Sequence, residues 1–580
     1  MKRVAAILAV VILAVLAYAA FRPVKSPKEE ILKGAKLQPY NIMYITSESF
    51  NLHHLGCYGY TKLTSPTIDQ LAKEGVRFTQ MINASAWTNE SLISLFTSLE
   101  SGIHGVITRS RNIDPAWYTP LEILHDLGYK IPRLQGFQGD QNHSFLGFDD
   151  IEYISKFEWF DRYHGRVPQP FFFWWHFLPT HLPYDAPDTY LNMFFREDMV
   201  KTPGSRERIA RVRKDSVIYR SSVTFNPAED GEAINALYCA EVRRFDDFVK
   251  LCLDTLKREG LDKNTIVIVS CDHGEEILEH GHVGHSSTSG AGDLYDELIH
   301  IPFIMWCPSL LPQGKVIDAQ MRTIDVMPTL FEILGIPVPS YFRGKSMLGL
   351  LLGHEPAEDR LAFSQTSKYG FGEPDPFNVK DYVYCVRTPQ WKFISNVSNR
   401  EPVREELYRI DSDTTEQHDV IDTFPREAND FRAKLTERVL EYTRVHPPAI
   451  DVPVAVTPLE KVKDFFGIPL STYDFRGVPR PAWINPKDGV DWKYALTQGK
   501  IRLEWEGKPD CPYVIEYELG TGDYHLKSLV KVKGNVLDFG SFTENYWNTY
   551  LVVRNPFKLR VSPDKEPRDW SDWTTFRFAP

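Results

Sequence analysis

The stretch NTIVIVSCDHGEEILEHGHVGH, residues 264–285, carries the strongest fold signal in this sequence. Its β-branched run from Thr265 to Val269 is continuous rather than alternating, which is typical of a strand buried on both faces in a parallel or mixed sheet. The run ends at Asp272 and His273, and open α/β sheets bind their ligands at that edge. We therefore expect a site there, although an Asp–His pair can also serve only as a cap or a hydrogen-bonding feature.

Two further segments place polar side chains directly after predicted strands. Residues 41–46, NIMYIT, predict the first core strand, and Glu48 follows it. The apolar run 170–177 predicts another strand, and His181 follows it in a Pro-rich turn. Each residue also has a plainer interpretation, Glu48 as a surface glutamate and His181 as an ordinary loop residue.

Thr88 begins a segment with helical periodicity. Apolar residues recur at the i, i+3, i+4 and i+7 spacing of one helix face: Leu92, Leu95, Phe96 and Leu99. Thr88 thus lies at or near the helix N-cap, where its hydroxyl has two possible tasks. It could only cap the helix. It could also be a nucleophile, because free N–H groups and the positive end of the helix dipole attract a phosphoryl or sulfuryl group.

Composition excludes several classes of function. The chain has 580 residues, enough for two or three domains, and its 43% hydrophobic content is that of an ordinary globular protein. A net charge of -11 argues against nucleic acid as a partner, since phosphate binding needs concentrated Lys and Arg. The seven cysteines lack CxxC spacing, so they predict neither a disulfide framework nor a zinc ribbon.

The N-terminus predicts export. Lys2 and Arg3 precede an unbroken apolar stretch from Val4 to Phe21. This is either a secretory signal peptide or a short uncleaved anchor, and we expect the anchor. The predicted location is extracytoplasmic, in the periplasm or at the cell surface, with the N-terminal helix in the cytoplasmic (inner) membrane.

The remaining sequence divides into domains and linkers. A Pro-rich connector marks a boundary near His446, and residues 479–580 alternate apolar and polar residues with dense aromatics, which predicts a β-sandwich. Residues 185–232 lack periodicity and are either a lid or a surface excursion. The expected segments are a signal peptide or anchor (1–22), a linker (23–38), a catalytic domain (39–355), a C-terminal subdomain (356–447), a Pro-rich linker (448–478) and a fibronectin- or Ig-like accessory domain (479–580).

Together these motifs resemble the sulfatase family of the alkaline phosphatase superfamily. The matching stretches run from Asn41 to about Tyr442 and include NIMYITSESF, SPTIDQLAKEGVRF, PFFFWWHFLPTHLPY, VSCDHGE and LYDELIHIPFIMW. The resemblance implies an α/β fold with a mixed central β-sheet sandwiched by helices and a small α+β subdomain. It also implies a site at the strand ends.

The site motif departs from the family at the nucleophile. Sulfatases carry Cys or Ser in C/S-x-P-x-R, matured to formylglycine, whereas this chain has Thr88-Asn-Glu-Ser-Leu92. Threonine cannot become formylglycine. In this respect the sequence resembles the branch of lipoteichoic acid synthases and phosphoglycerol or phosphoethanolamine transferases.

That second resemblance implies a set of site residues. Around one divalent metal ion it places Glu48, Thr88, Asp272 and His273. His181 and His285 would contact the transferred group or protonate the leaving group. Mixed carboxylate and imidazole ligands suit manganese, magnesium or zinc better than the calcium of sulfatases.

The function expected from these residues is phosphoester transfer or cleavage. The substrate would be an envelope phospholipid or glycan, and the reaction would pass through a covalent Thr88 intermediate. Two alternatives remain: a sulfuric ester hydrolase, or a sulfatase-fold protein that binds glycans without catalysis. The sequence does not indicate the oligomeric state.

Overall fold

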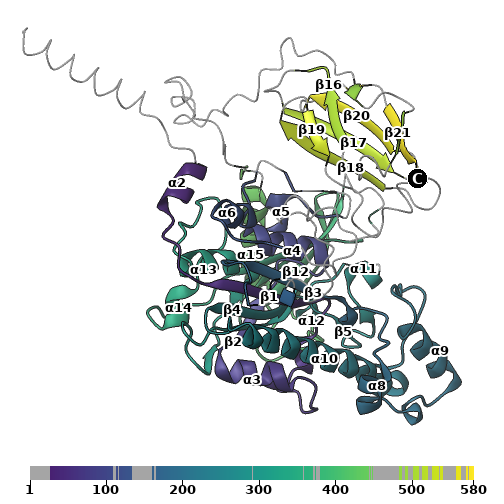
Figure 1. The fold of residues 1–580 in the computed structure, drawn as a ribbon. Helices are drawn as coiled ribbons and strands as arrows, with labels where there is room; N and C mark the ends of the chain where they lie inside the picture. Colours follow the sequence, from purple (N-terminus) through teal and green to yellow (C-terminus); the bar gives the residue numbers. More distant parts are fainter. Residues whose placement is uncertain are drawn as a thin grey trace, which may run out of the picture.

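The run that carries the fold signal forms β4, Thr265–Cys271, in the middle of a seven-stranded mixed sheet of the computed structural model (Figure 1). Every residue of β4 is buried, as its continuous apolar character predicts. The strand order is β3-β1-β4-β7-β2-β8, with β9 beside β2. The other strands are β1 (Asn41–Ser47), β2 (Val76–Ile82), β3 (Phe172–Phe177), β7 (His300–Trp306), β8 (Lys315–Ile317) and β9 (Met321–Arg322).

The structure describes residues 27–445 apart from short gaps and one long one and, further on, mainly strand segments between 483 and 579. The gaps before residue 445 are 109–110, 112, 115–116, 133–159, 162, 164, 290–291, 357, 370–372, 374–378 and 443.

Parallel pairing aligns three strand ends at one edge of the sheet. β1 runs parallel to both β3 and β4, and Ser47 pairs with Phe177 on one side and with Cys271 on the other. β7 is antiparallel to β4 and to β2, so the sheet is mixed. The residues that follow β1 and β4 therefore emerge close together.

Helices cover both faces of this sheet (Figure 1). α3 (Pro66–Glu74) and the long α10 (Pro227–Arg258) pack together on one face, and α4 (Thr88–Thr97) packs with α6 (Pro120–Asp126) and α13 (Val326–Ile333) on the other. The expected α/β sandwich is confirmed. Shorter helices and strands are α2 (Pro27–Gly34), α5 (Ser101–His104), α8 (Asp188–Phe194), α9 (Pro203–Val212), β5 (Glu276–Ile277), β6 (Val283–Gly284), α11 (Ser286–Ser289), α12 (Asp296–Ile299) and α14 (Leu348–Leu352).

A second, antiparallel sheet follows in the order β10-β11-β12-β13, with α15 (Pro425–Tyr442) packed against it. Its strands are β10 (Ala362–Ser367), β11 (Asp381–Arg387), β12 (Lys392–Ser398) and β13 (Glu401–Tyr408). Phe393 and Leu407 from the sheet and Phe431 from the helix share one buried cluster. This is the predicted α+β subdomain.

The C-terminal strands form two sheets, as expected of a β-sandwich. Trp505 of the first sheet and Tyr513 of the second are buried, with ring centroids 5.4 Å apart. The first sheet is β14-β16-β19 (Trp483–Asn485, Ile501–Trp505, Val536–Phe539), and the second is β15-β21-β20-β17-β18 (Val490–Lys493, Thr574–Ala579, Phe557–Pro563, Pro512–Leu519, Leu526–Lys533). The expected domain and linker boundaries remain predictions.

The predicted membrane anchor needs a correction. Residues 1–22 lie outside the described residues, and nowhere in the described part does a helix combine the length and apolar character that a membrane crossing needs. A crossing takes about 20 predominantly apolar residues. The longest described helix, α10, carries charged residues such as Glu241 and Arg244 along its length. The predicted anchoring in the cytoplasmic membrane is therefore wrong on this finding, because no described helix could provide it.

Candidate metal and nucleophile site

Three strand ends bring metal-ligating side chains together. Glu48 follows β1, His176 lies near the end of β3, and Asp272 follows β4. One ligand atom from each lies within 4.8 Å of the other two. Glu48 and Asp272 were expected here from the sequence, whereas His176 was not.

Thr88 and His273 complete the predicted quartet. Thr88 Oγ1 lies 3.5 Å from Glu48 Oε1 and 3.3 Å from His273 Nε2. Trp87 occupies the N-cap of α4, so Thr88 is the first helical residue. His273 Nδ1 lies 2.8 Å from the carbonyl oxygen of Gly274, which accepts the Nδ1 proton. The lone pair of His273 Nε2 then faces the Thr88 hydroxyl.

The hydrogen bonds of the Asp272 carboxylate indicate whether these residues suit a metal ion. Its Oδ1 accepts hydrogen bonds from the backbone N–H groups of Ser49 (3.0 Å) and His273 (2.8 Å). Its Oδ2 is buried and accepts no hydrogen bond from the described residues. A buried carboxylate oxygen without a donor is costly unless a cation neutralises it. The donor set therefore fits a divalent cation.

Aromatic packing fixes the position of α4 over the sheet. Phe96 packs edge-on against Trp174 of β3 at a centroid distance of 4.9 Å and against Tyr44 of β1 at 6.4 Å. Asn83, just after β2, donates to Ser91 Oγ at 2.9 Å and to Ser85 O at 2.9 Å. These contacts hold the first turn of α4 at the sheet edge.

Glu90 stabilises the turn that precedes Thr88. Its Oε2 accepts hydrogen bonds from the Ser85 hydroxyl and from Trp87 Nε1 (2.6 Å). Glu90 occupies the place of the proline in the sulfatase pattern, so a side-chain hydrogen-bonding centre replaces a rigid ring. Burial raises the pKa of Glu90 to about 8, although the bonds from Ser85 and Trp87 oppose the shift.

His181 and His285 lie beside the quartet, as expected. The ring centroid of His285 is 4.3 Å from that of His273 and 5.0 Å from that of His181. Burial lowers the pKa of His181 and holds the pKa of His285 well below its ordinary value. Both imidazoles are therefore neutral near pH 7, and each offers one N–H and one lone pair.

Glu275 and Tyr184 orient His285. Glu275 Oε2 lies 2.7 Å from His285 Nδ1, and Tyr184 donates to Glu275 Oε1 at 2.7 Å. Burial raises the pKa of Glu275, and the Tyr184 hydrogen bond opposes that shift. Sequence reasoning missed both Glu275 and His176. Two signals in the sequence point to these residues. Glu275 directly follows the Asp-His-Gly motif, and His176 is the one polar residue in an otherwise aromatic strand.

A second group of possible ligands lies further along the same loop. Ligand atoms of Glu276, His280 and Glu297 also lie within 4.8 Å of one another. Arg220 forms an ion pair with Glu276 at 2.7 Å, and His280 contacts Glu297 directly. Arg220 and His280 thus already pair with two carboxylates of this group, while Glu276 Oε1 accepts no hydrogen bond from the described residues.

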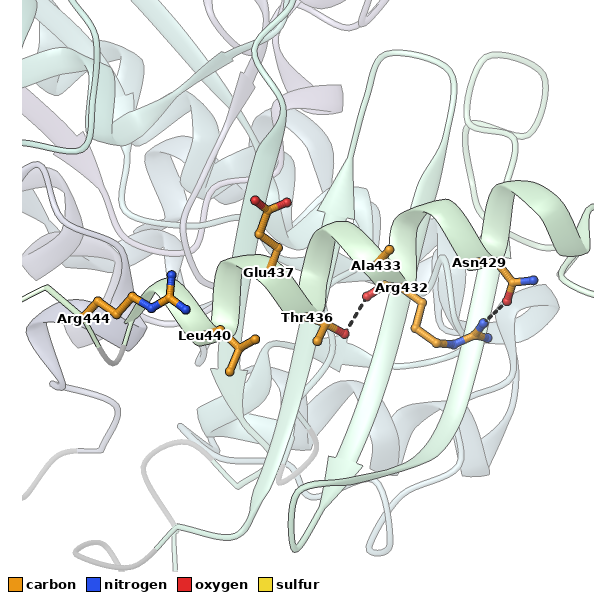
Figure 2. Close-up of a pocket in the computed structure, with 7 residues that line it drawn as sticks. All are labelled: Asn429, Arg432, Ala433, Thr436, Glu437, Leu440 and Arg444. Carbon is orange, nitrogen blue, oxygen red and sulfur yellow. Dashed lines mark hydrogen bonds between the residues drawn. The ribbon is translucent and has the colours of Figure 1, made fainter. Parts of the chain in front are cut away.

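A surface hollow of about 530 Å³ lies along α15 and contains none of the predicted site residues (Figure 2). It is lined by Asn429, Arg432, Ala433, Thr436, Glu437, Leu440 and Arg444. This hollow is therefore separate from the metal-ligating group.

Comparisons with known proteins bear on the fold and the family. The Sulfatase family model matches residues 40–336, and the model "N-sulphoglucosamine sulphohydrolase, C-terminal" matches residues 292–445. The uncharacterized sulfatase YidJ of Escherichia coli is 22% identical over 525 residues, covering 80% of this chain and 98% of YidJ.

Two solved structures share the fold. BT4656, in complex with its substrate D-glucosamine-2-N,6-O-disulfate, has a TM-score of 0.56 at 18% identity, covering 71% of this chain and 99% of that chain. The phosphonate monoester hydrolase of Agrobacterium radiobacter has a TM-score of 0.55 at 19% identity, covering 70% of this chain and 96% of that chain. At these identities the superpositions show a common fold.

Proposed function

The chain belongs to the sulfatase family, because the family model matches more than half of its residues. We propose that it is a metal-dependent hydrolase of sulfuric or phosphonic esters and that Thr88 is its nucleophile. Members of this family use a divalent metal ion, and the described residues include a group that could hold one. The observation that carries the proposal is the place of the Thr88 hydroxyl, against Glu48 and His273 at the start of α4.

Glu48, Thr88, Asp272 and His273 would hold the metal ion. When bound, a divalent ion lowers the pKa of a coordinated hydroxyl and neutralises negative charge on the ester. Because an imidazole joins the carboxylates, the set favours manganese or zinc over calcium.

The chain's own groups would bind and orient the ester. The first turn of α4 presents backbone N–H groups that have no intrahelical partner, and these attract anionic oxygens. His181 and His285 would take up a proton at Nε2 and pass it to the leaving group, because Nδ1 of each ring is engaged, by the Leu182 carbonyl oxygen at 2.6 Å and by Glu275 at 2.7 Å. Glu275 would keep the His285 ring in the orientation that this requires.

The choice of ester follows from the nucleophile and the structural neighbours. Thr88 has one hydroxyl, so its ester would break down when water attacks the sulfur or phosphorus atom. One neighbour holds a sulfated glucosamine, and another is a phosphonate monoester hydrolase. A sulfated sugar and an aryl phosphonate monoester are therefore the first substrates to test.

The test compares three variants of the purified chain loaded with manganese or zinc. We expect Thr88→Ala to lower kcat/KM at least about 10³-fold, as removal of a nucleophile does. Thr88→Ser should retain hydrolysis. Thr97→Ala, at the other end of α4, is the control and should behave as the parent. Full activity of Thr88→Ala would contradict the proposal.

A second candidate function is transfer of a phosphoglycerol- or phosphoethanolamine-type group to an alcohol. It is favoured by a threonine in the place where sulfatases form formylglycine. Both candidates share the Thr88 ester and differ in what resolves it. Adding glycerol to the reaction separates them, because transfer yields a glycerol ester and hydrolysis yields the free anion.

A further inference from the structure

His176 places a second imidazole beside the candidate metal site. In the parallel register of β1 and β3, His176 pairs with Thr46. His176 Nε2 lies 3.9 Å from Glu48 Oε2 and 3.8 Å from Asp272 Oδ2. These distances are too long for hydrogen bonds. Two ligands that each bind one metal ion at about 2.1 Å lie at most about 4.2 Å apart, so the spacing fits a shared cation.

The hydrogen bonds of Thr46 are compatible with a proton on Nδ1 of His176. Trp174 Nε1 can only donate, and it donates to Thr46 Oγ1 at 2.9 Å. The Thr46 hydroxyl donates its single hydrogen to the Trp175 carbonyl oxygen at 3.4 Å. His176 Nδ1 lies 2.8 Å from Thr46 Oγ1, and metal binding through Nε2 requires the tautomer in which Nδ1 donates this third bond. In that tautomer the lone pair of Nε2 lies on the side of the carboxylates.

A lone pair that faces two carboxylates is repulsive unless a cation lies between them. Asp272 is 2% exposed, and its Oδ2 accepts no hydrogen bond within the described chain. That oxygen lies 3.8 Å from His176 Nε2 and 3.4 Å from His273 Nε2. The ligand atoms of Glu48, His176 and Asp272 lie within 4.8 Å of one another, so one cation could contact all three.

We propose that His176 Nε2 is a direct ligand of the divalent cation, beside Glu48, Asp272 and His273. This rests on the metal site of the proposed function and adds a donor outside the four residues that the family resemblance implies. Two nitrogen donors with two carboxylates form a borderline-soft site, which selects zinc or manganese over calcium.

The first test is calorimetric titration of the full-length, metal-free protein with zinc, manganese and calcium chloride. In His176→Gln we expect zinc affinity to fall at least about tenfold, with a smaller change for calcium. His104→Gln is the matched control, because His104 is also a buried imidazole but bonds to Ser94 away from the site. Unchanged zinc affinity in His176→Gln would overturn the proposal.

X-ray absorption at the zinc edge decides the matter on the parent protein, even if His176→Gln does not fold. Two imidazoles per zinc ion support the proposal, and one overturns it. Thr88→Ala separates this inference from the proposed function. An active Thr88→Ala variant with two imidazoles per zinc ion would contradict the proposed function and leave the His176 proposal standing. An inactive Thr88→Ala variant with one imidazole per zinc ion would do the reverse.

Discussion

In both Asp272 and His273, one polar side-chain atom is held by the backbone and the other faces the site. Asp272 Oδ1 is held by two backbone N–H groups while Oδ2 faces the ligand group. His273 Nδ1 is held by the Gly274 carbonyl while Nε2 faces Thr88. In both residues the backbone fixes one atom and thereby aims the other. A positioned ligand of this kind loses little side-chain entropy when it binds a metal ion or substrate.

Glu275 offers a test at the residue scale, because its side chain bonds to His285, Tyr184 and Ser49 and was not among the proposed metal ligands. We expect Glu275→Gln to lower kcat by about 10- to 100-fold, the usual effect of losing an orienting partner. Zinc affinity should stay within error. Steady-state kinetics on an aryl ester and calorimetry measure the two effects.

The control for this prediction is Glu279→Gln. Glu279 lies in the same loop but bonds to Asn51 rather than to His285. Equal losses of kcat in the two variants would show that Glu275 acts through the stability of the loop and not through His285.

At the scale of elements, the strands were predictable and their order was not. The apolar runs of β1 and β4 are local properties, as is the helical stripe that places Thr88 at the start of α4. The order β3-β1-β4 depends on packing across the whole sheet. His176 lies within a strand rather than after it, so its one local signal is to be the polar residue of an aromatic strand, and the proximity of its ligand atom to Glu48 and Asp272 shows that it faces the site.

Glu90 gives a prediction about pH at the start of α4. Burial raises its pKa from 4.5 to about 8 in the folded protein. Because the folded state holds this proton more tightly, the stabilisation is complete below pH 4.5 and is lost as the pH rises towards 8. Glu90→Gln should remove that loss and increase the free energy of unfolding at pH 8 by a few kcal/mol, at about 1.4 kcal/mol per unit of pKa.

Urea unfolding of the parent and Glu90→Gln at pH 5 and pH 8 measures this effect. Glu30→Gln, an exposed residue of α2, makes the same charge change and should alter neither value. If Glu90→Gln is no more stable than the parent at pH 8, Glu90 is ionised in the folded protein without penalty.

At the scale of the whole molecule, buried ion pairs join the central sheet to the antiparallel sheet. Asp296 of α12 pairs with Arg387 of β11 at 2.7 Å and with Lys392 of β12 at 3.0 Å. Lys392 also pairs with Glu416 at 2.9 Å and is 0% exposed. The sequence predicted both layers, but the network depends on residues about 90 to 120 positions apart, a separation over which no local pattern extends.

Lys392→Met should destabilise the protein by about 3–5 kcal/mol, because it leaves two buried carboxylates without their shared cation. Thermal unfolding followed by circular dichroism measures the change. Lys250→Met breaks an exposed i,i+4 pair with Asp254 and should have an effect within about 0.5 kcal/mol. A similarly small effect of Lys392→Met would mean that the two sheets do not depend on this network.

The most direct test of the central claim is the mass of the peptide that contains Thr88 after reaction. The metal-loaded protein would be mixed with an aryl phosphonate monoester or a sulfated glucosamine, quenched in acid within one turnover and digested. The proposal predicts one added phosphonyl or sulfuryl group on Thr88 and none in Thr88→Ala. Turnover that proceeds with Thr88 unmodified at every quench time, and at the same rate in Thr88→Ala, would contradict it.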